Sequence, residues 1–421
     1  MTFSTLGLSP ALLAAVDALG HTRPTAIQRD AIVPALAGLD ILGSAQTGSG
    51  KTLAFALPLL QNLKLTEARP RRAQALVLVP TRELAVQVGD VVRSLAQHLP
   101  HPVKVSTYFG GVSINPQLMG LRGGIDVVVV TFGRLLDLVA HNALTLDHVT
   151  TLVLDEADRM LDLGFAEELT QVMALLPSQR QSLFFSATFS LAVQHLAHTL
   201  LHNAVHVEVK GVTRQPIEIV QRAIAVDASR RTQLLRHLIT LHQWPRALVF
   251  VATKFAAEVV ADKLRKGGLT AEPFHGELSQ GKRTQVLTDF KASRLSVVVA
   301  TDVAARGLDI AELPVVVNFD LPRSAHDYTH RIGRTGRAGE AGLALSFVSA
   351  ATQAHWRLIE KRQHVALRLE HVDGFEPLEV APPATSAPDA PGNGGIKGRR
   401  PSKKDKLRAL GHLPNKIANT Q

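Results

Sequence analysis

Short runs made almost entirely of apolar, often β-branched residues recur along this chain of 421 residues, with stretches of helical spacing between them. Runs without the polar–apolar alternation of a half-exposed strand are typical of strands buried on both faces, as in parallel sheets. Between the runs, Leu84, Val88 and Val92 recur at the spacing of one helical face. Strand and helix in alternation predict an open α/β fold. The runs are residues 75–79, 125–130, 151–154, 182–185, 247–251, 296–300 and 314–317.

A polar break divides these runs into two series. Residues 209–217 are polar and contain Gly and Pro, which is typical of a linker. We expect one α/β domain over residues 1–208 and a second over 218–370, since the chain is long enough for two domains with their own cores. Residues 381–391 hold four prolines in eleven positions, so we expect a disordered spacer and tail over 371–421.

The formal net charge is +10, and most of it lies at one end of the chain. Residues 392–421 hold eight Lys or Arg against one Asp, a charge of +7, which leaves about +3 for the rest. A basic tail suits a polyanion such as nucleic acid, although a solvated tail that only maintains solubility stays open. Cysteine is absent, which excludes disulfides and cysteine metal sites and fits a reducing cytosol. No apolar run reaches the ~18 residues of a membrane helix, and no signal pattern opens the chain, so we expect a cytoplasmic protein.

A glycine-rich stretch follows the short apolar run at residues 39–42 and opens an apolar helix at 53–63. It nearly matches the phosphate-loop pattern in its strand–loop–helix context, with Ala45 in place of the first glycine. Lys51 would reach the β- and γ-phosphates, and the Thr52 hydroxyl would bind Mg²⁺. The alternative is a turn beside a surface lysine. The candidate phosphate-binding residues are Ala45, Gln46, Thr47, Gly48, Ser49, Gly50, Lys51 and Thr52.

A second apolar run, residues 151–154, turns abruptly acidic at Asp155 and Glu156. Asp155, the first residue off the strand, would hold Mg²⁺ directly or through water. Glu156 would orient and deprotonate a water for attack on the γ-phosphate. An acid pair that caps a helix is the alternative, and the loop at residues 45–52 weighs against it.

Residues 155–158 spell DEAD, and with the preceding loop the chain resembles the DEAD-box RNA helicases of superfamily 2, of bacterial type. The family's other motifs occur in order, and the resemblance covers residues 3 to about 340. They are the Q motif at 20–28 with Phe3 upstream, motif Ia at 80–85, a glycine pair at 110–111, TFGR at 131–134, SAT at 186–188, motif IV at 249–253, Q-x-x-R at 280–283, motif V at 300–309 and HRIGRTGRAG, motif VI, at 330–339.

The resemblance implies two tandem RecA-like domains, each an open parallel sheet flanked by helices, with ATP and Mg²⁺ as cofactors. By its motifs, Gln28 would read the adenine edge, Phe3 would stack on the ring and Asp309 would hold the ribose. Arg334 and Arg337 would be arginine fingers, a device worth about 10³–10⁵ in rate; the role of Arg331 stays open. The catalytic set is then Lys51, Glu156, Arg334 and Arg337, and the residues that couple hydrolysis to strand separation are Asp158, Ser186, Thr188 and His330.

RNA lying across both domains would favour their closure, with contacts mainly to phosphates and 2′-hydroxyls. Only 5% of the residues are aromatic, which favours backbone recognition over base stacking. By resemblance, the RNA-contact residues are Arg82, Gly111, Thr131, Arg134, Gln280, Arg283 and Thr301.

Three positions depart from the family pattern. Ala26 stands where the family usually has proline, and His21 replaces a phenylalanine, but Gln28 is kept. Phe132 replaces the proline of the usual TPGR turn, which frees φ and restores an N–H. Phe132 either fills the core, which is the preferred interpretation, or forms a stacking surface.

These features predict an ATP-dependent RNA helicase whose RNA-stimulated hydrolysis drives domain closure and local, non-processive unwinding of short duplexes or RNP remodelling. A DNA-directed activity of the same superfamily and an ATP-gated RNA clamp with little turnover are the alternatives. Ribosome assembly, mRNA decay and cold adaptation all stay open as pathways, as do protein partners and oligomeric state.

Overall fold

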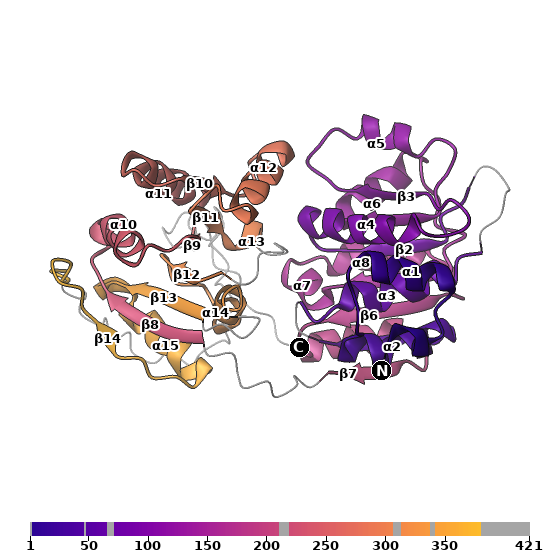
Figure 1. The fold of residues 1–421 in the computed structure, drawn as a ribbon, viewed down its shortest axis with the longest axis horizontal. Coiled ribbons are helices and arrows are strands. Elements are labelled where there is room, and N and C mark those ends of the chain that lie inside the picture. The colour runs from indigo at the N-terminus through magenta and orange to yellow at the C-terminus, as the bar shows by residue number, and fades with distance from the viewer. Residues whose placement is uncertain are drawn as a thin grey trace, which may run out of the picture. The chain divides into compact units, whose positions relative to one another are not determined.

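Two seven-stranded sheets, parallel in every described strand pair, form the framework of the chain (Figure 1). The structure is a computed structural model that describes residues 2–45, 48–64, 71–209, 219–305, 313–336 and 342–379. Each sheet is covered by helices on both faces, so the chain has two tandem RecA-like α/β domains, as the sequence predicts. No described helix combines the length and apolarity needed to cross a bilayer.

The first sheet has the strand order β3-β4-β2-β5-β6-β1-β7. Its residues alternate between two cores: Ala75 and Val77 face one, Leu76 and Leu78 the other. Helices α1 to α4 cover the first core and α6 to α9 the second. The strands are β1 Ile41–Ser44, β2 Ala75–Leu78, β3 Val105–Tyr108, β4 Val127–Val130, β5 Thr151–Asp155, β6 Gln181–Ser186 and β7 Val205–Glu208. The helices are η1 Phe3–Leu6, α1 Pro10–Ala18, α2 Ala26–Leu36, α3 Lys51–Gln61, α4 Arg82–Ala96, α5 Asn115–Gly120, α6 Phe132–Ala140, α7 Ala157–Asp162, α8 Ala166–Leu175 and α9 Leu191–Leu200.

The second sheet repeats this plan with the order β10-β11-β9-β12-β13-β8-β14. Helices α10 and α11 cover one face, and α12 to α15 cover the other. The strands are β8 Ile219–Ala225, β9 Ala247–Val251, β10 Ala271–Phe274, β11 Val297–Thr301, β12 Val315–Asn318, β13 Gly342–Val348 and β14 Leu369–Glu370. The helices are η2 Ala228–Arg230, α10 Arg231–His242, α11 Lys254–Lys266, α12 Gln280–Lys291, α13 Asp302–Ala305, α14 Ala325–Ile332, η3 Ala350–Thr352 and α15 Gln353–Gln363.

Every apolar run singled out in the sequence contains a strand, although the run at residues 39–42 is shifted, because β1 begins at Ile41. The edge strands of the first sheet, β3 and β7, are not continuous apolar runs and were not singled out in the sequence. β3 reads VSTY and β7 reads VHVE, and both have partly exposed positions because an edge strand is covered less completely than a central one. Residues 210–218, which contain most of the expected linker, lie outside the described residues.

The second domain continues past residue 370, where the sequence predicts the spacer to begin. Val372 and Phe375 pack against the core beneath α10 and α11. The carboxylate of Asp227 accepts hydrogen bonds from the backbone N–H groups of Leu378 and Glu379, at distances of 2.9 to 3.1 Å. The boundary at residue 370 is therefore too early, because polar composition alone does not reveal a few anchoring contacts; residues 380–421 lie outside the described part of the chain.

Candidate functional site

The glycine-rich loop lies between β1 and α3, at the carboxyl edge of the first sheet. Gly48 and Gly50 have φ angles of 78° and 91°, which glycine adopts at little steric cost. A Cβ on Gly50 would stand 2.3 Å from Nε2 of Gln28, so the loop also needs glycine there for space. α3 begins at Lys51, which aims the unpaired N–H groups of its first turn at the loop, an arrangement suited to phosphate. Gln46 and Thr47 lie outside the described residues.

Lys51 and Asp155 lie together beneath this loop, and both are buried. Nζ of Lys51 donates to the carbonyl of Ala45 at 2.8 Å. Within the described residues, Oδ1 of Asp155 is buried and has no hydrogen-bond partner. Burial raises the pKa of Asp155 to about 7, against the opposing effect of the Lys51 ammonium.

An unpartnered buried carboxylate oxygen is a group that a hard cation completes, so the residues fit Mg²⁺. The described residues bring no three His, Cys, Asp or Glu side chains together as a metal site. That also fits Mg²⁺, which in nucleotide sites is held by one or two carboxylates together with the phosphates. Asp155 and, by its place in the phosphate-loop motif, Thr52 would hold it.

Glu156 has a left-handed backbone, with φ of 58°, directly after β5. Such a conformation costs a non-glycine residue about 1–3 kcal/mol and is concentrated at functional sites. Its carboxylate forms an ion pair with Arg159 at 2.6 Å, and both side chains are nearly buried. Arg159 was not among the residues predicted from the sequence, although the spacing of three residues between Glu156 and Arg159 could have predicted their ion pair. The strained turn places the Glu156 carboxylate immediately beside Asp155.

Asp158 connects the acidic turn to the SAT motif. Its Oδ2 accepts from the backbone N–H of Thr188 at 2.9 Å and from the Thr188 hydroxyl at 2.8 Å. Ser186, the last residue of β6, donates its hydroxyl to the carbonyl of Thr188. Three of the four predicted coupling residues are therefore in one hydrogen-bonded unit. The coupling role of His330, on the second domain, stays a prediction.

Gln28 and Phe3, the predicted adenine contacts, are both engaged inside the protein. Oε1 of Gln28 accepts from the Thr25 N–H, and Nε2 donates to the Gly50 carbonyl at 3.0 Å. The first bond belongs to the capping box that begins α2, just before Ala26. Phe3 is 5% exposed and packs into the core. The adenine contacts therefore stay predictions.

The four predicted RNA contacts of the first domain follow three neighbouring strands, β2, β3 and β4. Arg82 is the first residue of α4, and Gly111 has φ of 75°. A Cβ on Gly111 would lie 2.0 Å from Nη2 of Arg82, so the glycine makes room for the guanidinium. Thr131 is the N-cap residue of α6. The motifs are thus brought together at one edge of the sheet.

Arg134 has a different position from a surface contact. It is 5% exposed, and its Nη2 donates to the Val112 carbonyl at 2.8 Å. In this structure it holds the loop that carries Gly111. Phe132 is 1% exposed and stacks on Phe165 with ring centroids 5.3 Å apart, so its role as core filling is confirmed.

In the second domain, Thr301 ends β11 and Gln280 begins α12. Arg283 donates to the His275 carbonyl at 3.1 Å and lies 4.7 Å from the Phe274 ring centroid. These residues stand at the carboxyl edge of the second sheet or on the helix next to it. Arg283 is 4% exposed, as buried as Arg134, and the RNA contacts of this domain stay predictions. Asp309 lies outside the described residues.

The arginines of motif VI have different environments. Arg331 is 2% exposed and makes two hydrogen bonds to the Asp302 carboxylate, at 2.6 and 2.7 Å, while its guanidinium stacks 4.9 Å from the Phe250 ring centroid. It is an internal residue and not a finger. Arg334 follows α14, is half-buried and lines a small pocket with His330. Arg337 lies outside the described residues.

Comparisons with known proteins agree with this arrangement. The DEAD/DEAH box helicase family matches residues 25–196, and the helicase conserved C-terminal domain matches residues 230–339. DEAD-box ATP-dependent RNA helicase CshA of Bacillus cereus is 40% identical over 360 residues, which cover 86% of this chain and 68% of that protein. ATP-dependent RNA helicase DeaD of Mycobacterium tuberculosis is 40% identical over 399 residues, 94% of this chain and 70% of that protein.

A solved structure of S. cerevisiae Dbp5 bound to RNA and ADP BeF3 superposes with a TM-score of 0.74 at 31% identity, covering 88% of this chain and 95% of that chain. Fold, motif order and sequence relatives therefore agree: the chain belongs to the DEAD-box family and is an ATP-dependent RNA helicase.

Proposed function

We propose that RNA-stimulated ATP hydrolysis in this chain drives closure of its two domains and local, non-processive separation of short RNA duplexes or remodelling of RNPs. The observation that best supports this proposal is Asp155, a buried acid beside Lys51 and the strained Glu156, with one oxygen that has no partner among the described residues. A site of this kind is incomplete in the protein alone, and a nucleotide with its metal would complete it.

In this proposal, the first domain supplies the phosphate-binding groups and the base. The N–H groups of the loop and the Lys51 ammonium bind the phosphates, and Glu156 takes the proton of the attacking water. Bound Mg²⁺ would neutralise charge on the β- and γ-phosphates. Arg159 holds the Glu156 carboxylate in place through their 2.6 Å ion pair.

The second domain supplies Arg334 and Arg337 to the γ-phosphate, which makes hydrolysis conditional on closure. RNA contacts by Arg82, Thr131, Gln280, Arg283 and Thr301 go to phosphates and 2′-hydroxyls, so binding carries little sequence preference. Arg134 acts indirectly, by holding the loop of Gly111. Asp158 and Thr188 transmit the state of the ATP site within the first domain.

The test measures release of a strand from a short RNA duplex, together with ATP turnover in the presence of RNA and of DNA of equal length. The proposal expects ATP-dependent strand release and stimulation by RNA alone. Equal stimulation by DNA would favour a DNA-directed enzyme. RNA binding that depends on ATP, with little turnover and without any strand release, would favour the RNA clamp.

A further inference from the structure

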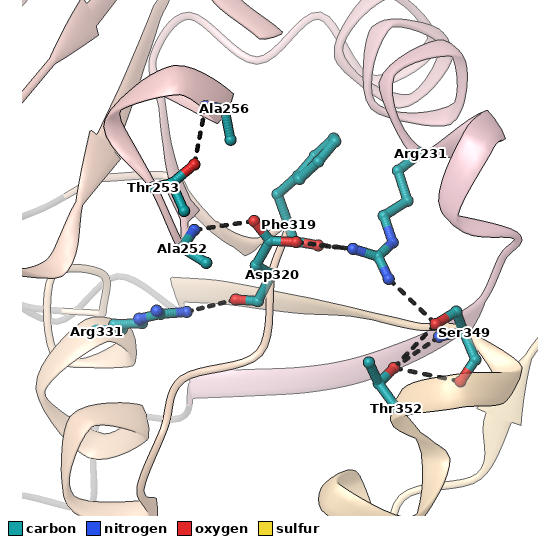
Figure 2. A network of polar contacts seen from close by, with 9 residues as sticks. All are labelled: Arg231, Ala252, Thr253, Ala256, Phe319, Asp320, Arg331, Ser349 and Thr352. Carbon is teal, nitrogen blue, oxygen red and sulfur yellow. Dashed lines mark hydrogen bonds and ion pairs between the residues drawn. The ribbon is translucent and has the colours of Figure 1, made fainter. Parts of the chain in front are cut away.

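Asp320, which no motif includes, joins three segments of the second domain. It follows β12, and its Oδ2 accepts from the backbone N–H of Ala252 at 2.9 Å, just after β9. Its Oδ1 accepts from Nη1 of Arg231 at 2.8 Å, and its carbonyl accepts from Nη1 of Arg331 at 2.6 Å. Figure 2 shows these bonds converging on the one residue.

Arg231 extends these contacts to the next strand. It is the first residue of α10 and is 8% exposed. Besides Asp320, its guanidinium donates to the Phe319 carbonyl at 3.3 Å and to the Ser349 hydroxyl at 3.1 Å (Figure 2). Ser349 follows β13, and β9, β12 and β13 are consecutive in the sheet. We call Arg231, Ala252, Asp320, Arg331 and Ser349 the Asp320 network.

We call the turn that carries Arg334 the finger turn, and its backbone begins at Arg331 of this network. α14 ends at Ile332, and the N–H of Arg334 donates to the carbonyl of Arg331 at 3.2 Å. The carbonyl of Arg334 accepts from the Leu313 N–H at 3.2 Å. One side of the turn that carries Arg334 is therefore held by a residue whose guanidinium is itself fixed by Asp320, Asp302 and Asn318.

We propose that Arg231 and Asp320 are positioning residues for ATP hydrolysis, which hold Arg331 and, through it, the turn that carries Arg334. The proposal rests on the function proposed above, in which Arg334 reaches the γ-phosphate. Neither residue touches the nucleotide. Arginine suits the position because its planar fork reaches a carboxylate, a carbonyl and a hydroxyl together, which a lysine cannot do.

A purely structural role for the same bonds is the competing explanation, and the chain offers a matched control for it. Arg222 pairs with Glu370 through two guanidinium nitrogens, in the same sheet but on β8 and β14. That pair has the same chemistry and no contact with the Asp320 network among the described residues. Glu370→Gln therefore removes an arginine–carboxylate pair without disturbing the finger turn.

The experiment measures the RNA-stimulated kcat and the KM for ATP of the full chain with Asp320→Asn, Arg231→Lys and Glu370→Gln. We expect Asp320→Asn to lower kcat about 10- to 100-fold, since a misplacement of about 1 Å costs on the order of 10²-fold. Arg231→Lys should lower kcat less, because it keeps a charge near Asp320. In both variants the KM for ATP should stay within about twofold of the parent value, because the phosphate loop is on the other domain. Glu370→Gln should match the parent.

A double-mutant cycle with Arg334→Lys distinguishes positioning from general damage. If Asp320 acts through Arg334, Asp320→Asn should cost little further kcat once Arg334 is already Lys. If the kcat of the double variant falls by the product of the two single-variant losses, the proposal is overturned. A parent-like kcat in Asp320→Asn would overturn it as well. Should Asp320→Asn fail to fold by circular dichroism, the same cycle with Arg231→Lys decides on the same criteria. Parent-like turnover of Arg334→Lys alone would instead contradict the finger role in the proposed function.

Discussion

Two acids occupy corresponding places in the two sheets and have opposite surroundings. β5 and β12 are the fourth strands in their sheets, and Asp155 and Asp320 stand at their carboxyl ends. Asp155 has a buried oxygen without a hydrogen bond in the described part of the chain. Asp320 has both carboxylate oxygens bonded, one to Arg231 and one to the Ala252 N–H.

The difference separates two uses of one sheet position. An unpartnered buried carboxylate costs stability until a ligand completes it, so its presence in the first domain is best explained by binding. A carboxylate with each oxygen bonded to the protein, as in Asp320, instead fixes the segments around it. In the proposed function, the carboxyl edge of the first sheet would bind the nucleotide, and that of the second would orient the residues that approach it.

The largest effects should follow from substitutions at the carboxyl edge of the first sheet. We expect Lys51→Ala to abolish ATP binding, because the β- and γ-phosphates lose their cation. We expect Glu156→Gln to keep ATP binding but to lower turnover by about 10³-fold or more, and to prolong RNA binding in ATP. Nucleotide titration and steady-state ATPase assays measure the two steps. Normal hydrolysis by Glu156→Gln would remove Glu156 as the base.

Two lysine substitutions in motif VI should distinguish an arginine that binds the γ-phosphate, Arg334, from one that bonds within the second domain, Arg331. Arg334→Lys should lower kcat by about 10²–10³-fold with little change in folding, since lysine cannot reproduce the planar fork on a phosphate. Arg331→Lys should lower the free energy of unfolding by about 1–3 kcal/mol, besides the kcat lost through the turn of Arg334, because it breaks buried bonds to Asp302 and Asn318. Urea unfolding and ATPase assays on both variants test the contrast. Equal unfolding free energies in parent and Arg331→Lys would refute the internal role of Arg331.

The titration of Asp155 should make the nucleotide-free protein less stable as pH rises from about 4 to about 7. The folded pKa is raised from 3.8 to about 7 by burial, so within this window the folded state binds one more proton than the unfolded state. That group alone contributes a fall of about 1.4 kcal/mol per pH unit in unfolding free energy. The difference between parent and Asp155→Asn, measured by urea unfolding at several pH values, isolates this slope. A difference that does not change with pH would contradict the burial of the charge.

The smallest effect should come from truncation of the basic tail, which contains residues of neither of the two acid sites. Truncation after Glu379 keeps the contacts of Asp227 with Leu378 and Glu379, so the second domain should stay folded. We expect ATPase activity at saturating RNA within about twofold of the parent, about tenfold weaker RNA affinity at physiological salt, and a shallower dependence of affinity on salt concentration. An unchanged salt dependence would return the tail to a solubilising role.

The sequence could predict the elements that depend on local pattern. The central strands, the glycine-rich loop and the acidic turn are all short patterns with a direct physical meaning, and the described residues of each lie in the predicted strand, loop or turn. Asp320 also had a usable signal, since an acid follows the apolar run at residues 314–317 much as Asp155 follows 151–154. Its role could not be predicted, because Arg231 and Ala252, the partners of its carboxylate, are distant in the sequence. The same holds for Arg134, whose burial depends on packing that no local pattern encodes, and for the anchoring of residues 371–379 by Asp227.

The opposed surroundings of the two acids are tested most directly by the free energy of unfolding of Asp155→Asn and Asp320→Asn, measured side by side at pH 8 without nucleotide. Asp155→Asn removes a buried charge whose Oδ1 has no hydrogen-bond partner among the described residues, and should raise the unfolding free energy, by on the order of 2–4 kcal/mol. Asp320→Asn leaves the buried Arg231 guanidinium and the Ala252 N–H without their acceptor charge, and should lower it by about 1–3 kcal/mol. Changes of the same sign in the two variants would contradict the assignment of one acid to a ligand and the other to the protein.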